Sequence, residues 1–166
     1  MKYSIVYSSL TGNTKLLADE LNKNLKSNDC LYCGELNDKA LEADFIFVGF
    51  WTDRGTCDKK CQEFLKKIKN KEIFLFGTVG FGVSADYFKT VIDKVKDNLD
   101  KSVIVKDYFM CQGKMQQAVR DRYEEIRRTD PSARNINMLI ANFDEALSHP
   151  NKKDINNFIK KVKELK

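Results

Sequence analysis

The stretch from Lys2 to Leu17, KYSIVYSSLTGNTKLL, constrains the fold more than any other part of the chain. It begins with a mostly apolar run, Tyr3 to Tyr7, which is typical of a buried parallel strand. A turn rich in hydroxyl groups follows, and Leu17, Leu21 and Leu25 then recur at helical spacing. A strand that passes through such a turn into a helix directs N–H and hydroxyl donors at one point, where the helix dipole favours an anion. The stretch therefore predicts a phosphate site.

The rest of the chain continues this alternation of strands and helices. Further strands are expected over Asp29–Gly34, Asp44–Phe50, Glu72–Thr78 and within Ser102–Cys111; helices are expected over Asn13–Lys26, Cys57–Ile68, Phe88–Leu99, Met115–Ile126, Ile136–Leu147 and Asn151–Leu165. The alternation predicts an α/β fold, a doubly wound five-stranded parallel sheet in the order 2-1-3-4-5 with helices on both faces. Extra helices follow the fifth strand. All 166 residues are expected to form one domain.

The overall charge does not indicate a nucleic-acid partner. The formal net charge is +5, but the lysines are spread along the helices, as expected for a solvated face. A nucleic-acid site would need a concentrated basic stripe with stacking aromatic residues. No apolar stretch reaches membrane-spanning length, and the first residues do not resemble a signal peptide. We therefore expect a cytoplasmic protein with no membrane partner.

The cysteines and the histidine do not suggest a metal or disulfide site. The count of five cysteines is odd, which favours reduced thiols. Cys30 and Cys33 are expected on a strand, where residues three apart point to opposite faces, so a redox dithiol is disfavoured there. Cys57 and Cys61 are expected to share a buried helical face. Because His149 is the only histidine, few ligand sets for zinc are available, and no metal is expected.

Three polar loops are predicted to meet at one edge of the sheet. In the order 2-1-3-4-5, ligands bind beyond the carboxyl ends of the strands, where the winding reverses. The loops that meet there are Ser9–Thr14, Trp51–Thr56 and Thr78–Val83. The first offers hydroxyl groups, the second an aromatic ring and the third several glycines. All three loops therefore have compositions that suit a ligand site.

The segment Ser9-Leu10-Thr11-Gly12-Asn13-Thr14 resembles the phosphate loop of flavodoxins, Ser/Thr-x-Thr-Gly-x-Thr. The resemblance implies that these residues hold the phosphate of flavin mononucleotide (FMN), with hydroxyl groups in place of a lysine as donors. The alternative is an ordinary capped turn between a strand and a helix. The position directly after the first strand favours the flavin interpretation. Trp51-Thr52-Asp53 is similar to the Trp-Gly-Asp of many flavodoxin second loops.

The flavin ring needs stacking surfaces and close contact with the main chain. Trp51 and Phe81 are the candidate stacking residues, although either could belong to the core. Gly77, Gly80 and Gly82 would let the main chain approach the ring. The end of the fifth strand, at Cys111-Gln112-Gly113-Lys114, is expected near the cofactor edge. The complete set of candidate FMN-binding residues is Ser9, Leu10, Thr11, Gly12, Asn13, Thr14, Phe50, Trp51, Thr52, Asp53, Thr78, Val79, Gly80, Phe81, Gly82 and Cys111.

The chain departs from the flavodoxin pattern in three ways. Thr52 replaces the glycine whose peptide flips in flavodoxins when the flavin takes up one electron, and a β-branched residue resists the positive φ that such a flip can need. The chain is basic, whereas many flavodoxins are strongly acidic. A long segment also follows Cys111. Together, Gly49-Phe50-Trp51, Asp53-Arg54-Gly55-Thr56 and Cys111-Gln112-Gly113-Lys114 resemble a divergent flavodoxin-like subgroup of anaerobic bacteria.

Three functions are compatible with these features. The first is an electron carrier that delivers electrons to a partner redox enzyme and needs no catalytic side chain. Its segment Lys114–Ser148, with Arg120, Arg122, Arg127 and Arg128, is predicted either to face an acidic partner or only to cover the sheet. The second is an NAD(P)H-dependent FMN or quinone reductase, in which Arg54, Lys114 and the basic segment Arg120–Arg134 would form the cleft for the nicotinamide nucleotide. The third, a phosphate-accepting receiver, is disfavoured because Ser8 and Ser9 occupy the place of its paired acids.

Overall fold

The computed structural model describes residues 1–165, so the predicted domain 1–166 extends one residue beyond the described part. Its sheet has the strand order β2-β1-β3-β5-β6, and these strands run parallel. The strands are β1 (Tyr3–Tyr7), β2 (Cys30–Glu35), β3 (Phe45–Asp53), β4 (Thr56–Cys57), β5 (Glu72–Val79) and β6 (Ile104–Gln112). Because β4 only pairs antiparallel with the end of β3, the order confirms the predicted 2-1-3-4-5 sheet.

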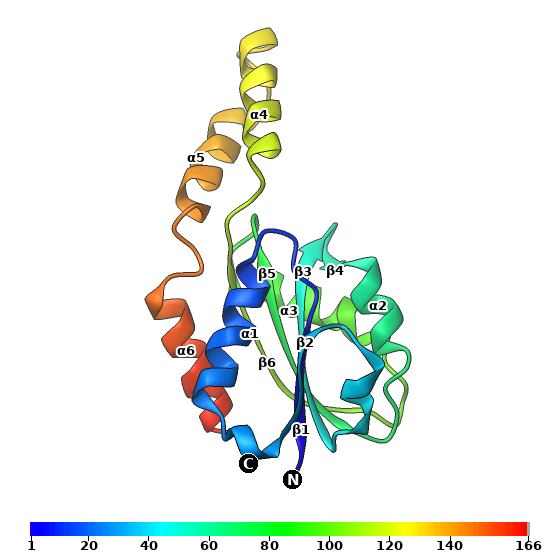
Figure 1. Ribbon diagram of the computed structural model, residues 1–166. Helices are drawn as coiled ribbons and strands as arrows, with labels where there is room; N and C mark the ends of the chain where they lie inside the picture. Colours follow the sequence, from blue (N-terminus) through cyan, green and yellow to red (C-terminus); the bar gives the residue numbers. More distant parts are fainter. Residues whose placement is uncertain (166) are drawn as a thin grey trace.

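Helices cover both faces of the sheet, as predicted (Figure 1). One face packs against α1 (Asn13–Asn24) and α6 (Lys152–Lys163) through a cluster that includes Leu17, Leu21 and Phe158. The other face packs against α2 (Lys59–Leu65) and α3 (Ala85–Lys96) through a second cluster. Short 3-10 helices, η1 (Ser27–Asp29) and η2 (Asp38–Glu42), flank β2. The sheet is therefore buried on both sides, which explains why its strands read as continuous apolar runs.

Two helices begin with capping side chains. The Ser84 side chain accepts a hydrogen bond from the main-chain N–H of Tyr87 at the start of α3. Asn151 and Asp154 form a capping box at the start of α6, in which each side chain accepts from the other residue's main-chain N–H. Phe158 on α6 lies 5.2 Å from Phe76 between ring centroids. These contacts hold α6 against the sheet after a long excursion of the chain.

Phe50 and Gly77 face each other across β3 and β5 and complete the core. Their positions are opposite in the strand register, and a Cβ atom at Gly77 would lie 2.5 Å from the Phe50 ring. Gly77 therefore makes room for an aromatic side chain of the core. That it also lets the main chain approach a cofactor stays a prediction. Phe50 itself is fully buried in the cluster beneath α2 and α3. Although Phe50 was predicted to contact the cofactor, its side chain lies in the core.

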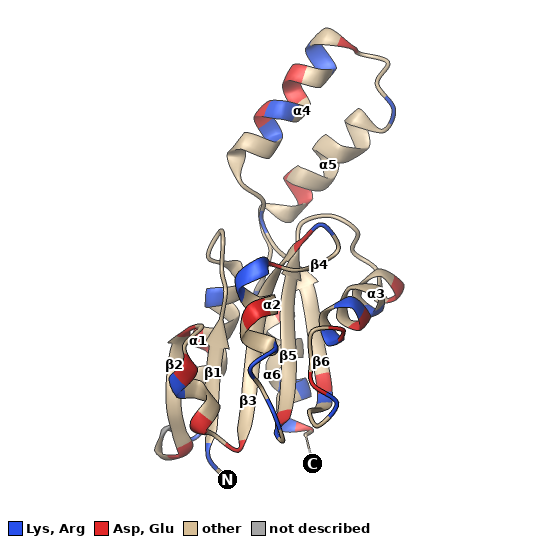
Figure 2. Cartoon of the chain, turned by 90° about the vertical axis from the view of Figure 1, so that its right-hand side faces the viewer, with Lys and Arg blue, Asp and Glu red and all other residues tan. Residues whose placement is uncertain are grey.

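The helices α4 (Gln117–Thr129) and α5 (Ile136–Ala146) form a hairpin that projects beyond the carboxyl edge of the sheet (Figures 1 and 2). We call this hairpin, residues 117–146, the arm. No residue of α4 is buried. The buried residues of α5, including Ile140 and Phe143, belong to neither core cluster. The alternative that these helices only cover the sheet is therefore wrong.

The remaining sequence-based predictions concern cysteines and membranes. All five cysteines are free thiols; Cys57, Cys61 and Cys111 are buried. Cys57 lies on β4 and not on the helix that contains Cys61, so the predicted helix Cys57–Ile68 is shorter than expected. Among residues 1–165, no helix has the length and apolar character needed to cross a membrane.

Candidate functional site

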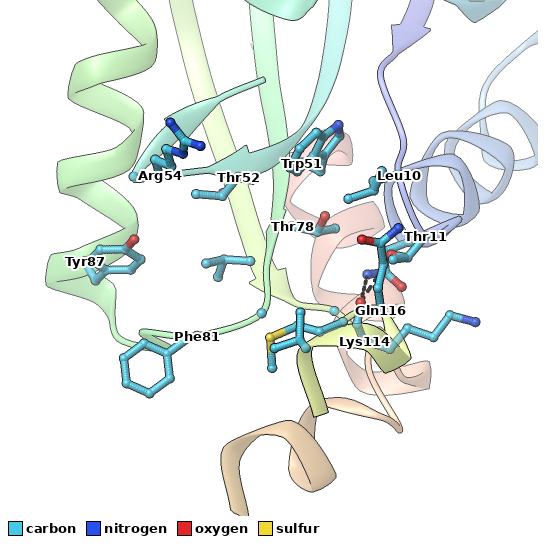
Figure 3. A pocket seen from close by; sticks show the side chains of 17 residues that line it. Leu10, Thr11, Trp51, Thr52, Arg54, Thr78, Phe81, Tyr87, Lys114 and Gln116 are labelled. Atoms are coloured by element: carbon cyan, nitrogen blue, oxygen red, sulfur yellow. Dashed lines mark hydrogen bonds between the residues drawn. The ribbon is translucent and has the colours of Figure 1, made fainter. Parts of the chain in front are cut away.

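A cleft of about 310 Å³ opens at the carboxyl edge of the sheet (Figure 3). This volume lies at the lower end of the range typical of small-molecule sites, about 300–1,000 Å³. The cleft lies beside the point where the winding reverses between β1 and β3. Predicted residues that line it are Leu10, Thr11, Asn13, Trp51, Thr52, Thr78, Val79, Gly80 and Phe81. The structure thus brings together residues of all three predicted loops.

The other predicted residues lie around the cleft without lining it. Ser9, Gly12 and Thr14 belong to the first loop, Asp53 lies on the second and Gly82 on the third. Cys111 is buried in the core cluster beneath α1 and α6, and burial raises the pKa of its thiol well above the usual range. Cys111 therefore points away from the cleft. Its register partner, Thr78, lines the cleft instead.

The second predicted loop is a β-hairpin. Strand β3 continues through Asp53 and pairs with β4, with Thr52 opposite Cys57. Arg54 and Gly55 form the turn, with φ angles of 52° and 84°. The prediction of a loop from Trp51 to Thr56 is wrong because the β-branched Thr52 and Thr56 extend the strands on both sides of this turn. The Thr52 peptide is consequently held in a ladder, which adds to the resistance against a flip.

The first loop engages most of its side-chain donors within the protein. Thr11 Oγ1 donates to the Lys114 carbonyl oxygen at 3.2 Å, and Asn13 Nδ2 donates to the same oxygen at 2.8 Å. Thr14 is fully buried, and its hydroxyl donates to the Phe50 carbonyl oxygen at 3.1 Å. Hydroxyl groups were predicted to hold a phosphate, but in this conformation the hydroxyls of Thr11 and Thr14 point at protein oxygens.

The main chain of the first loop provides the donors that remain. Gly12 precedes α1 in a left-handed conformation, with φ of 85°. Among residues 1–165, no hydrogen bond was found for the main-chain N–H groups of Gly12, Asn13 and Thr14. These groups lie at the start of a helix of 12 residues, where an anion is favoured. The loop therefore offers main-chain donors at the predicted phosphate position.

The third loop is fixed by residues that follow β6. A Cβ atom at Gly80 would lie 2.3 Å from Met115 Cγ, so only glycine leaves room for this methionine. The Gly80 carbonyl oxygen accepts from Asn142 Nδ2 on α5 at 2.9 Å and from Gln112 Nε2 at 3.3 Å. The base of the arm is thereby attached to the loop that carries Phe81, which is 44% exposed.

Gly113 and Lys114 were expected near the cofactor edge, and both line the cleft. The sequence-based predictions missed the residues that continue this wall, Met115, Gln116 and Val119, and they missed Tyr87, which lies on the opposite side with Arg54 and Gly55 (Figure 3). The signal that could have found the first group was the direct continuation of the chain from Lys114. A Cβ atom at Gly113 would lie 2.3 Å from Asn13 Nδ2, so this segment packs directly on the first loop.

The charged residues that line the cleft are cations. They are Arg54, in the hairpin turn, and Lys114, beside the first loop. Figure 3 shows them on opposite sides of the cleft, with Trp51 between them. A site with this charge is suited to an anionic ligand.

A buried carboxyl group lies at the foot of the hairpin, outside the cleft lining. Asp58 Oδ2 accepts a hydrogen bond of 2.5 Å from Ser8 Oγ, and burial raises the pKa of this carboxyl. The neighbouring Cys57 thiol has a lowered pKa because it is hydrogen-bonded to Cys61. Asp58 is only 4% exposed, so this group connects β1 to the start of α2 and is not accessible to a ligand in the cleft.

The fold and the cleft define a doubly wound α/β protein with a ligand site at its topological switch point. A model of the flavodoxin domain matches residues 4–163. The chain therefore belongs to the flavodoxin domain family, as its phosphate-loop motif predicted.

Individual relatives agree with this assignment. The flavodoxin-like domain-containing protein BilS of Clostridium symbiosum (strain WAL-14163) is 37% identical over 172 residues, with 93% of this chain and 90% of the relative covered. BilS of Clostridioides difficile (strain CD3) is 35% identical over 162 residues, with the same coverage of 93% and 90%. A solved flavoprotein in complex with FMN from Lactobacillus acidophilus has a TM-score of 0.51 at 16% identity, covering 66% of this chain and 92% of that protein. The last comparison supports the fold alone.

Proposed function

We propose that this protein binds FMN in the cleft and carries electrons to a partner redox enzyme in the cytoplasm. The observation that supports this most strongly is the cleft itself, because it joins Trp51, Phe81 and a helix N-terminus at the switch point of a flavodoxin-domain protein. Its charged lining residues, Arg54 and Lys114, are cations, which suits the phosphate of FMN. FMN typically serves the flavodoxin family as cofactor, and the flavoprotein from Lactobacillus acidophilus was solved in complex with it.

The chain's own residues would divide the binding between them. Trp51 and Phe81 offer aromatic surface for the ring, and the main-chain N–H groups of Gly12, Asn13 and Thr14 face the phosphate position. When bound, FMN supplies the redox chemistry, and the protein supplies binding, orientation and electrostatics. The residues present thus fit the cofactor without a dedicated acid, base or nucleophile.

We further propose that the arm shapes the surface on which the partner docks. It rises from the same residues that form one wall of the cleft, Met115 to Val119, so a partner that approaches the flavin meets the arm (Figure 1). The segment Lys114–Ser148 contains six basic and six acidic residues and is formally neutral. The partner is therefore recognised at least as much by the shape of the arm as by its charge.

The arginines predicted to face an acidic partner are mostly engaged within the arm. Arg120 pairs with Asp144 of α5 and, at 3.2 Å, with Glu124. Arg127 pairs with Glu124 at 2.5 Å, and Arg128 pairs with Glu125 at 2.6 Å. Figure 2 shows basic and acidic segments interleaved along α4. The four arginines therefore do not form a free, outward cluster. Of the four, only Arg122 lacks an acidic partner among residues 1–165.

A direct experiment distinguishes the electron carrier from the alternative function, an NAD(P)H-dependent reductase. The FMN-loaded protein is mixed anaerobically with NADH or NADPH and its flavin absorbance is followed. A carrier keeps its oxidised spectrum, is reduced when a flavoprotein reductase is added, and then reduces an acceptor enzyme. Rapid stoichiometric bleaching by NADH or NADPH alone would instead establish the reductase. A protein that takes up no flavin would contradict both functions.

A further inference from the structure

We propose that Lys114 supplies the positive charge that holds the phosphate of FMN. This role is absent from the phosphate-loop motif, which contains no lysine, and it rests on the proposed function. It would make Lys114 a determinant of cofactor choice, selecting a flavin with a phosphate monoester over one without. The inference depends on four features of the structure.

The first feature is the fixed position of the Lys114 main chain. Its N–H donates to the His149 carbonyl oxygen at 3.0 Å. Its carbonyl oxygen accepts from Asn13 Nδ2 at 2.8 Å and from Thr11 Oγ1 at 3.2 Å. These hydrogen bonds attach Lys114 to the first loop itself, although the two are about 100 residues apart in sequence. The lysine therefore starts from a defined point beside the phosphate position.

The second feature is the state of the loop donors. The Thr11 and Thr14 hydroxyls donate to main-chain carbonyl groups, and Ser9 Oγ accepts from the Lys15 N–H at 3.2 Å. The donors that remain for a phosphate are the Ser9 O–H and the main-chain N–H groups at the start of α1, all of them neutral. A phosphate monoester carries nearly two negative charges at neutral pH. A nearby ammonium group would balance this charge where the hydroxyls do not.

The third feature is a second hollow of about 330 Å³ on the other side of Lys114. It shares Thr11, Asn13 and Lys114 with the main cleft and is also lined by Gly12. A ligand whose ring occupies the cleft beside Trp51 can therefore extend across Thr11 and Asn13 toward Gly12. Lys114 is the charged residue that lines both spaces. In Figure 3 its side chain extends away from the Phe81 side of the cleft.

The fourth feature is that other basic side chains near the first loop already contact acidic residues. Lys15 pairs with Asp19 at 2.6 Å. His149 Nδ1 lies 2.6 Å from Asp154 Oδ2, in the capping box of α6. Among residues 1–165, Lys114 forms no ion pair, and it is exposed. Its ammonium group is thus available to a ligand, whereas Lys15 is paired with Asp19 and the His149 ring is hydrogen-bonded to Asp154.

The experiment titrates the full-length protein with FMN and with riboflavin, at low and at high salt. The variants are Lys114→Met, Lys114→Arg and, as a matched control, Lys15→Met, which removes a paired lysine from the first turn of α1. We expect Lys114→Met to weaken FMN binding by about tenfold or more, the size of one charge-assisted hydrogen bond, and to leave riboflavin binding within about twofold. Lys114→Arg should retain most of the preference, and Lys15→Met should change neither affinity.

Salt dependence gives an independent readout. Added salt should weaken FMN binding to the unaltered protein more than to Lys114→Met, because exposed charges are screened. An FMN preference that survives Lys114→Met with an unchanged salt dependence would overturn this inference and leave the proposed function intact. Equal losses for FMN and riboflavin would show that Lys114 only supports the packing of the first loop. If the unaltered protein does not prefer FMN over riboflavin, the proposed FMN site fails as well.

Discussion

The body of the molecule and the arm are held together by different interactions. In the body, apolar side chains such as Leu17, Ile92 and Phe158 are fully buried against both faces of the sheet. In the arm, α4 has no buried residue, α5 buries a short stripe that includes Ile140 and Phe143, and an ion pair between Arg120 and Asp144 connects the two helices. Apolar burial and a cooperative sheet make the body rigid, whereas exposed ion pairs contribute little each. The body is therefore a scaffold and the arm a more easily altered attachment.

The cleft lies where these two regions meet. The body contributes Trp51 and the first loop, and the base of the arm contributes Met115 and Val119. Polar contacts fix the junction, through the Lys114 carbonyl on one side and Asn142 on the other. If the cleft binds FMN and the arm meets a partner, as proposed, the body would fix the position of the cofactor and the arm could vary without disturbing it.

The largest difference between body and arm is expected in global stability, when a buried aromatic side chain is truncated to alanine. Phe158→Ala removes a fully buried ring that lies 5.0 Å from Phe109 and 5.2 Å from Phe76, and should lower the free energy of unfolding by about 3–5 kcal/mol. Phe143→Ala, in the arm, should change the unfolding of the body by about 1 kcal/mol or less while α5 loses protection. Urea unfolding and amide hydrogen exchange measure the two effects. Equal losses of global stability would mean that arm and body unfold as one unit.

The two walls of the cleft are expected to contribute unequally to flavin binding. Trp51→Ala should weaken FMN binding by about tenfold, because aromatic stacking contributes about 0.5–1.5 kcal/mol beyond area burial. Val119→Ala, on the arm side, should weaken it by about threefold or less, as expected for two lost methyl groups in an open site. Fluorescence titration gives both affinities. If Trp51→Ala destabilises the fold but leaves the flavin affinity of the folded protein unchanged, Trp51 belongs to the core.

Loss of one ion pair should loosen the arm alone. Arg120→Gln removes the contacts with Asp144 and Glu124, so hydrogen exchange in α5 should accelerate while exchange in the sheet stays unchanged. Arg122→Gln is the matched control, since it removes an arginine of α4 without a pair in the described residues. Similar exchange rates in the two variants would show that the ion pair does not hold the arm.

The smallest effect is expected from a substitution in the β3–β4 hairpin of the body. Because the ladder between Thr52 and Cys57 holds the peptide in addition to the β-branched side chain, Thr52→Gly alone should raise the yield of one-electron-reduced flavin only slightly. An anaerobic dithionite titration of the FMN-loaded protein measures this yield. Abundant one-electron-reduced flavin in the unaltered protein would contradict the idea that the backbone is restrained here.

Most of the body could be predicted from the sequence because its signals are local. Apolar runs such as Glu72–Val79 and the stripe of α6 define strands and helices without knowledge of their neighbours. The helices of the arm were also predicted, but not their position. Ile140 and Phe143 show a buried stripe, yet periodicity does not say whether a sheet or another helix buries it. Because the position of the arm was not predicted, the part of the cleft wall that leads into it, Met115 to Val119, was missed as well.

Two details of the site depend on contacts that no motif contains. Thr52 and Thr56 extend a hairpin only because Arg54 and Gly55 can both adopt positive φ. The phosphate-loop hydroxyls turn toward protein oxygens because the Lys114 carbonyl reaches Thr11 and Asn13 from about 100 residues away. Long-range hydrogen bonds of this kind cannot be read from spacing.

The central claim is that the cleft and the first loop bind FMN through its phosphate, and the most direct test is the ratio of FMN to riboflavin affinity for the unaltered protein. The phosphate is the only difference between the two ligands, and each charge-assisted hydrogen bond contributes about 1.5–3 kcal/mol. We predict that FMN binds at least about 100-fold more tightly, with quenching of Trp51 fluorescence. Comparable affinities for the two flavins would contradict the account.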